Sequence, residues 1–98
     1  MAQYFLTRKA KNDLAEIWDY ILKTWSEEQA GKYYKLLIEE FKSISENPHF
    51  GKEYPHVAPN LFASIFKMHL IFYRKIDENK IEITRILHQS MDVENHLK

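Results

Sequence analysis

The feature that most constrains this chain is a pair of helical stripes that follow each other with almost no linker. Apolar residues recur every three or four positions from Ala10 to Trp25 and again from Ala30 to Ile44, as in amphipathic helices that bury one face. Thr7 and Ser26 stand before the two stripes as candidate N-caps. Asn47-Pro48 ends the second stripe, because the residue before a proline is driven out of the helical region. We therefore expect a helical hairpin.

On both sides of this hairpin the apolar pattern changes to that of β-strands. A short apolar run opens the chain, and three β-rich runs follow a turn-forming stretch at residues 49–60. The expected strands are residues 3–6, 61–66, 70–76 and 80–87. This order predicts an α+β fold, in which an N-terminal strand and the α-helical hairpin pack on a small antiparallel β-sheet. A length of 98 residues suits one core, so residues 1–98 are expected to form a single domain.

Composition excludes several classes of function. The chain has no cysteine, which rules out disulfides, thiolate metal sites and cysteine nucleophiles. We expect neither a signal peptide nor a membrane span, and so a cytoplasmic protein. The 14 basic and 14 acidic side chains balance, whereas a dedicated nucleic-acid binder usually has a basic excess. The histidines lack metal-ligand spacing and two glycines cannot build a phosphate loop, so no metal or cofactor is expected.

The strand expected at residues 70–76 holds the first candidate site residues. Strand alternation places Tyr73 and Arg74 on opposite faces. In the structural interpretation they are rim residues of a strand that is buried on both faces. In the functional interpretation they form part of a binding or reactive surface.

The last strand holds the second group of candidates. Alternation places His88 on one face and Arg85 on the other, the latter together with Ile81, Ile83 and Leu87. A cation at the end of an apolar row requires a carboxylate, and Asp92 is the expected partner. A histidine can act as an acid or a base near neutral pH, so His88 is interpreted either as a packed residue or as a catalytic one. As a catalytic residue it would form an acid–base pair with Glu53 of the preceding loop, for phosphodiester cleavage.

Short motifs recur in a fixed order along nearly the whole chain. They include Leu6-Thr7, Gln29-Ala30, Ile44-Ser45-Glu46-Asn47-Pro48, the segments HLIFYR at 69–74 and IEITRILH at 81–88, and Met91-Asp92. Their order and spacing resemble the RelE/ParE toxin superfamily, and most closely its ParE branch. The resemblance implies the same α+β fold and a type II toxin that a ParD-like antitoxin neutralises in a hetero-oligomer. The antitoxin is expected to wrap the hairpin and the sheet, with contacts at Lys23, Lys32 and Lys35.

The two branches of the superfamily differ in their targets. ParE-like members poison DNA gyrase, whereas RelE-like members cut messenger RNA on the ribosome. RelE-like relatives are typically strongly basic, and one nuclease branch has a tyrosine directly after the histidine of the last strand. This chain is neutral and has Gln89 after His88, so both departures favour a gyrase inhibitor that is not an enzyme and does not read nucleic-acid sequence.

The target-binding residues expected for a gyrase inhibitor are Lys67, Tyr73, Arg74, Arg85, His88, Met91 and Asp92. Two alternatives stay open. In the first, the protein is an mRNA interferase, an endoribonuclease whose catalytic residues are His88, Arg85 and Arg74. In the second, it is an inactive module that still binds the antitoxin.

Overall fold

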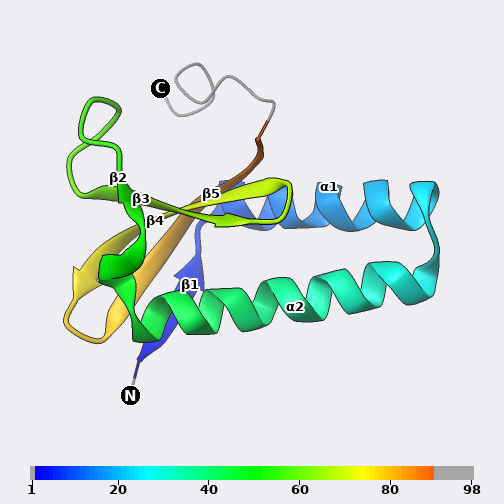
Figure 1. The fold of residues 1–98 in the computed structure, drawn as a ribbon, viewed down its shortest axis with the longest axis horizontal. Coiled ribbons are helices and arrows are strands. Elements are labelled where there is room, and N and C mark those ends of the chain that lie inside the picture. The colour runs from blue at the N-terminus through cyan, green and yellow to red at the C-terminus, as the bar shows by residue number, and fades with distance from the viewer. Residues whose placement is uncertain (1, 90–98) are drawn as a thin grey trace.

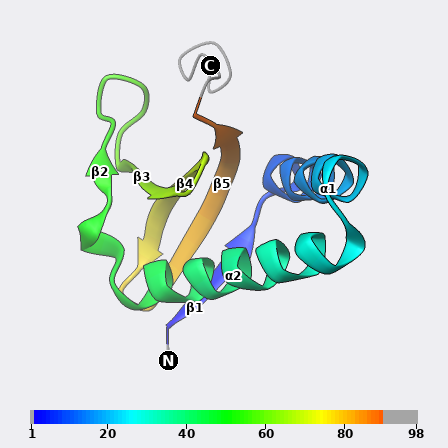
Figure 2. The same cartoon turned by 45° about the vertical axis from the view of Figure 1, so that its right-hand side comes forward.

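Two helices that form a hairpin lie on one face of a five-stranded sheet in the computed structural model, which describes residues 2–89 (Figures 1 and 2). In chain order the elements are β1 (Gln3–Leu6), α1 (Arg8–Thr24), α2 (Glu27–Glu46), the 3₁₀ turn η1 (Pro48–Phe50), β2 (Lys52–Glu53), β3 (Leu61–Phe66), β4 (His69–Asp77) and β5 (Lys80–His88). The predicted α+β class and the hairpin on a small sheet are confirmed.

Local capping bonds fix where the two helices begin. The Thr7 hydroxyl accepts a hydrogen bond from the Ala10 backbone N–H at 3.1 Å, and the Ser26 hydroxyl accepts one from the Gln29 N–H at 3.1 Å. Such caps satisfy backbone groups that have no partner inside the helix, and each contributes about 1 kcal/mol. Trp25 and Ser26 alone separate the two helices, and the chain reverses direction there (Figure 1).

The sheet has the strand order β1-β5-β4-β3-β2. Strands β3 to β5 form an antiparallel meander, as predicted, and β2, which was not predicted, pairs antiparallel with β3. Strand β1 differs, because it pairs in parallel with β5 from Gln3 opposite Lys80 to Leu6 opposite Ile83. The sheet is therefore mixed, and the hairpin belongs to the long connection that a parallel pair requires. The stretch predicted to be a loop also contains η1 and the two-residue edge strand β2.

A β-bulge in β5 changes which side chains face the helices. Phe72 of β4 lies opposite Arg85 but its neighbour Tyr73 lies opposite Ile83, so Thr84 is an extra residue in β5. A one-residue shift moves the following side chains to the other face. The prediction that Arg85 shares a face with Ile81 and Ile83 is therefore wrong, whereas its place on the face of Leu87 and opposite His88 is correct.

The hydrophobic core lies in two unequal parts. The main core fills the space between the sheet and the hairpin, and its fully buried members include Leu37, Phe41, Ile71, Tyr73, Ile81 and Ile83. Full burial of one such side chain contributes about 1.5–3 kcal/mol. A smaller cluster on the opposite face of the sheet consists of Leu61, Ala63, Phe72 and Leu87, and Tyr54, Val57 and Ala58 pack against it. The hairpin thus covers one face of the sheet, and residues 54–58 cover only part of the other.

Candidate functional site

An ion pair between Asp13 of α1 and Arg85 of β5 lies at the centre of the candidate site. The Arg85 Nε donates to Asp13 Oδ2 at 2.8 Å and its Nη2 donates to Oδ1 at 3.0 Å. The Asp13 side chain is only 11% exposed and that of Arg85 only 19%. This bidentate hydrogen bonding raises the pKa of Arg85, although burial acts in the opposite direction. Arg85 is therefore a permanent cation held in one orientation.

Sequence reasoning missed Asp13 as the partner of Arg85, although a signal for it exists. Asp13 lies three residues after Ala10, on the apolar stripe of the helix, where an acid requires a polar partner. Asp13 also accepts a hydrogen bond from the Ile86 N–H at 3.0 Å. Ile86 lies in β5 past Ile83, the last residue that pairs with β1. Asp92, the predicted partner, lies outside the described residues.

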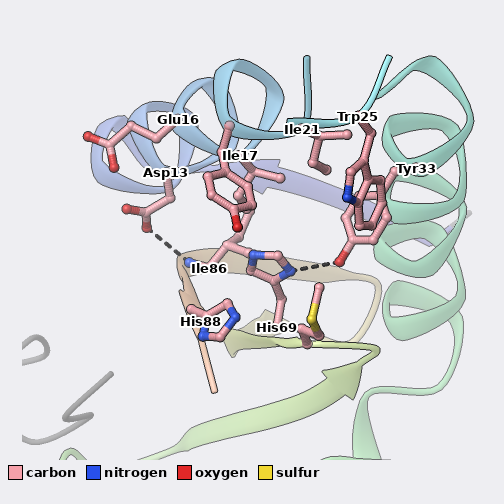
Figure 3. A pocket seen from close by; sticks show the side chains of 11 residues that line it. Asp13, Glu16, Ile17, Ile21, Trp25, Tyr33, His69, Ile86 and His88 are labelled. Atoms are coloured by element: carbon pink, nitrogen blue, oxygen red, sulfur yellow. Dashed lines mark hydrogen bonds between the residues drawn. The ribbon is translucent and has the colours of Figure 1, made fainter. Parts of the chain in front are cut away.

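A cavity of about 450 Å³ opens between the hairpin and the ends of β4 and β5 (Figure 3). We call it the aromatic cavity. It is lined by Asp13, Glu16, Ile17, Tyr20, Ile21, Trp25, Tyr33, Met68, His69, Ile86 and His88. Figure 3 shows Asp13 and Glu16 on one side of the cavity and Trp25 and Tyr33 on the other, with His69 and His88 below.

His69 and Tyr33 form a buried polar pair in the wall of the aromatic cavity. The Tyr33 hydroxyl lies at hydrogen-bond distance, 2.7 Å, from His69 Nδ1, and the His69 and His88 ring centroids are 5.6 Å apart. Burial lowers the pKa of His69, and the electrostatic effect of the neighbouring His88 lowers it further. Burial also raises the pKa of Tyr33. Both groups are therefore neutral at pH 7, and sequence reasoning had assigned neither to a site.

A second cavity, of about 400 Å³, lies at the start of α1 and on the other face of β5. We call it the basic cavity. It is lined by Thr7, Arg8, Lys9, Val57, Ala58, Leu61, Arg74, Glu82, Thr84 and Arg85. Arg74 reaches Glu82 only at 3.7 Å, and its side chain is half exposed. Arg8 and Lys9 are additions to the predicted site residues.

The predicted target-binding residues fall in different places. Arg74 and Arg85 line the basic cavity, whereas His88 lines the aromatic cavity. Lys67 is exposed in the β3–β4 turn, with a positive φ of 55° and its Nζ 5.7 Å from the centroid of the Tyr33 ring. These residues therefore do not form one continuous surface.

Tyr73, which was predicted to bind the target, does not lie at the surface of the free protein. Its side chain is 1% exposed, and its hydroxyl donates to the Pro48 carbonyl at 2.8 Å. Tyr73 therefore connects the main core to η1 and supports the surface from beneath. Met91 and Asp92, the other two predicted target residues, lie outside the described residues.

The other predicted sites are either exposed or dispersed. Lys23, Lys32 and Lys35 are exposed on the hairpin, and the Lys32 Nζ lies 3.5 Å from Glu28. Their contact with an antitoxin stays a prediction. Glu53 and His88 do not meet, because β3 and β4 separate their strands by roughly 14 Å at the usual strand spacing.

Residues 2–89 contain neither a membrane-spanning helix nor a cluster of metal ligands. In that part of the chain, no helix is long and apolar enough to cross a membrane. Nor does any group of three or more His, Asp or Glu side chains there have the arrangement of a metal site.

Comparison with known proteins assigns the family. The family model described as "ParE toxin of type II toxin-antitoxin system, parDE" matches residues 4–93. The chain is 36% identical to Toxin ParE1 of Caulobacter vibrioides over 97 residues, 99% of each chain. It is 32% identical to Toxin ParE1 of Mycobacterium tuberculosis over 96 residues, 98% of each chain.

A solved structure has the same fold. It is titled "Chromosomal ParDE TA system from P. aeruginosa" and aligns with a TM-score of 0.73 at 24% identity, over 90% of this chain and 95% of the other. The family match covers both helices, strands β2 to β5 and all of β1 except Gln3. The chain therefore belongs to the ParE toxin family of type II toxin–antitoxin systems.

Proposed function

We propose that this protein is a toxin that inhibits DNA gyrase by protein–protein contact, without catalysis of its own, and that a cognate antitoxin neutralises it. The observation that carries the proposal is the match to the ParE family over residues 4–93. Gyrase inhibition is the activity of the ParE branch that the sequence resembles. The proposal places the protein in the cytoplasm, where gyrase acts.

The geometry of the candidate residues favours binding over ribonuclease activity. RNA cleavage would need His88 beside cations that hold the phosphate. Arg74 and Arg85 instead line the basic cavity, on the opposite face of β5 from His88. Asp13 also occupies two N–H groups of the Arg85 guanidinium. The zero net charge adds to this argument, because RNA binding relies on a basic excess.

Exposed apolar side chains on the hairpin support an antitoxin partner. Tyr20 is 64% exposed and Trp25 is 49% exposed, and both line the aromatic cavity. Leu22, Tyr34 and Leu36 are further exposed apolar residues of the same two helices. An amphipathic segment of the antitoxin that lies over the aromatic cavity would bury Tyr20 and Trp25.

A supercoiling assay tests the proposal. Purified protein is added to gyrase, ATP and relaxed plasmid, with and without the antitoxin. We expect loss of supercoiling and accumulation of linear DNA, both reversed by the antitoxin. Arg74→Ala should weaken the inhibition, because Arg74 is an exposed predicted target residue. Lys35→Ala should inhibit like the wild type but need more antitoxin for reversal.

One outcome would contradict the proposal. If the protein stops growth but leaves supercoiling undisturbed, its target is not gyrase. Primer extension on translated messages would then show whether it produces discrete cuts, and His88 would be the first residue to replace.

A further inference from the structure

The basic cavity has an excess of positive charge. Arg8 and Lys9 from the start of α1, Arg74 from β4 and Arg85 from β5 line it, and Glu82 is the acidic residue among the described residues of its lining. Asp13 holds Arg85 from outside, so within residues 2–89 the lining and its ion-pair partners comprise four cations and two carboxylates. Neither Arg8 nor Lys9 has an ion-pair partner within residues 2–89. The cavity is therefore electrostatically suited to an anion.

The charges at the start of α1 oppose the usual preference of helices. Acidic side chains are favoured in a first turn, since the helix dipole is positive there. Helix α2 follows this rule with Glu27 and Glu28, whereas the first turn of α1 has no acidic residue and begins with Arg8 and Lys9. Local rules of this kind are most often broken at functional sites. An anion that binds in the cavity would compensate for the unfavourable charges.

The shape and walls of the cavity indicate which anion it binds. Val57, Ala58 and Leu61 form an apolar side next to the cations. A volume of about 400 Å³ holds one or two side chains of a peptide. The zero net charge of the chain argues against a polynucleotide, whose binding would call for a longer basic surface. A ligand that carries a carboxylate next to an apolar side chain would match both the cationic part and the apolar part of the cavity wall.

We propose that the basic cavity binds an acidic side chain of the antitoxin, together with an apolar neighbour of that side chain. The inference rests on the proposed function and adds a contact on the face of the sheet away from the hairpin. Because Arg74 and Arg85 are also predicted to bind the target, an antitoxin in this cavity covers them. Neutralisation then occurs by direct competition for the same cations.

Charge reversal tests the contact. Arg8→Glu and Lys9→Glu are compared with Lys11→Glu, which lies near the same helix end but does not line the cavity. Affinity for the full-length antitoxin encoded with this toxin is measured by calorimetry at low and at moderate salt. Each cavity variant should bind about tenfold more weakly at low salt and depend less on salt concentration. Lys11→Glu should bind like the wild type.

Thermal unfolding of the free proteins separates binding from folding. An acid near the start of α1 is favoured by the helix dipole, so Arg8→Glu and Lys9→Glu should melt at or above the wild-type temperature. A more stable protein that binds its antitoxin less tightly is the signature of the proposed contact.

The outcomes distinguish this inference from the proposed function. Wild-type protein that binds no antitoxin would refute both. Wild-type binding that Arg8→Glu and Lys9→Glu leave unchanged would refute the inference alone. The same holds if these variants lose affinity for a labelled single-stranded RNA while antitoxin binding stays intact, since the cavity would then be a nucleic-acid site.

Discussion

Asp13 holds Arg85 at the boundary between the two cavities of this protein. The carboxylate lines the aromatic cavity and the guanidinium lines the basic cavity. Asp13 also accepts the Ile86 N–H at 3.0 Å, although the pairing of β1 with β5 ends at Ile83. One side chain of α1 therefore takes the place of a strand along the edge of β5. The relative position of the helix and the two cavities depends on it.

We predict that Asp13→Asn destabilises the protein by about 1–3 kcal/mol. Asparagine can still accept from the Ile86 N–H, but it removes the negative charge that faces the poorly exposed Arg85. Urea unfolding measures the loss. Asp19→Asn, at an exposed position of the same helix, should change the free energy of unfolding by less than about 0.5 kcal/mol. Equal effects of the two substitutions would mean that the ion pair contributes nothing specific.

Gly51 is predicted to tolerate no side chain. Its φ of −73° is accessible to any residue, so the space around Gly51, and not its backbone conformation, determines whether a side chain fits. A Cβ there would collide with the Tyr73 hydroxyl and lie 3.0 Å from the Ala63 carbonyl oxygen. We expect Gly51→Ala to destabilise by about 1–3 kcal/mol in urea unfolding.

Gly31 provides the matched control for Gly51. It lies in α2, and a Cβ added to it would meet no atom within 4 Å, so Gly31→Ala should stabilise the helix by about 0.5–1 kcal/mol. Adding Tyr73→Phe to Gly51→Ala should recover part of the loss, because the phenolic oxygen is the closest obstacle. No recovery would show that the clash lies elsewhere.

Features that depend on neighbouring residues were predictable from the sequence. The caps at Thr7 and Ser26 act over three residues, and the helices and main strands follow from the apolar period. The partner of β1 was not predictable, because four residues carry no information on pairing with residues 80–83.

The candidate site was less predictable than the fold. The face of Arg85 was predicted from the regular alternation of side chains along β5, and the bulge at Thr84 breaks that alternation. No turn-forming residue marks the position of the bulge in the sequence. Tyr33 and His69 are in contact although 36 positions separate them in the sequence. Arg8 and Arg74 line the same cavity because the fold brings distant segments of the chain together. Asp13 was the exception, since an acid on an apolar stripe is visible in the sequence.

His69 should make the stability of the protein depend on pH. Its pKa lies below the ordinary 6.5, because it is buried against Tyr33 and is subject to the electrostatic effect of the neighbouring His88. As pH falls below 6.5, the unfolded chain takes up a proton before the folded protein does. The contribution of neutral His69 is therefore complete above pH 6.5 and is lost as pH falls towards the lower, folded-state pKa.

The measurement compares unfolding free energies at pH 7.5 and pH 5.0. We expect His69→Gln to lose less stability on acidification than the wild type does, whereas His56→Gln, at an exposed position, should behave like the wild type. Titration of the histidine ring protons by NMR gives the pKa directly. A value for His69 at or above that of an exposed histidine would contradict the prediction.

Trp25 should report on the filling of the aromatic cavity. It lines the cavity at 49% exposure, whereas Trp18 packs edge-on against Tyr34 with ring centroids 5.8 Å apart. If the antitoxin covers the hairpin, the Trp25 side chain is shielded from solvent and its fluorescence emission moves to shorter wavelength. The shift should persist in Trp18→Phe and disappear in Trp25→Phe.

Because buried aromatic anchors often dominate interfaces, Trp25→Ala should also weaken antitoxin binding by about 1–2 kcal/mol. A shift that follows Trp18 instead would move the antitoxin to another face of the hairpin.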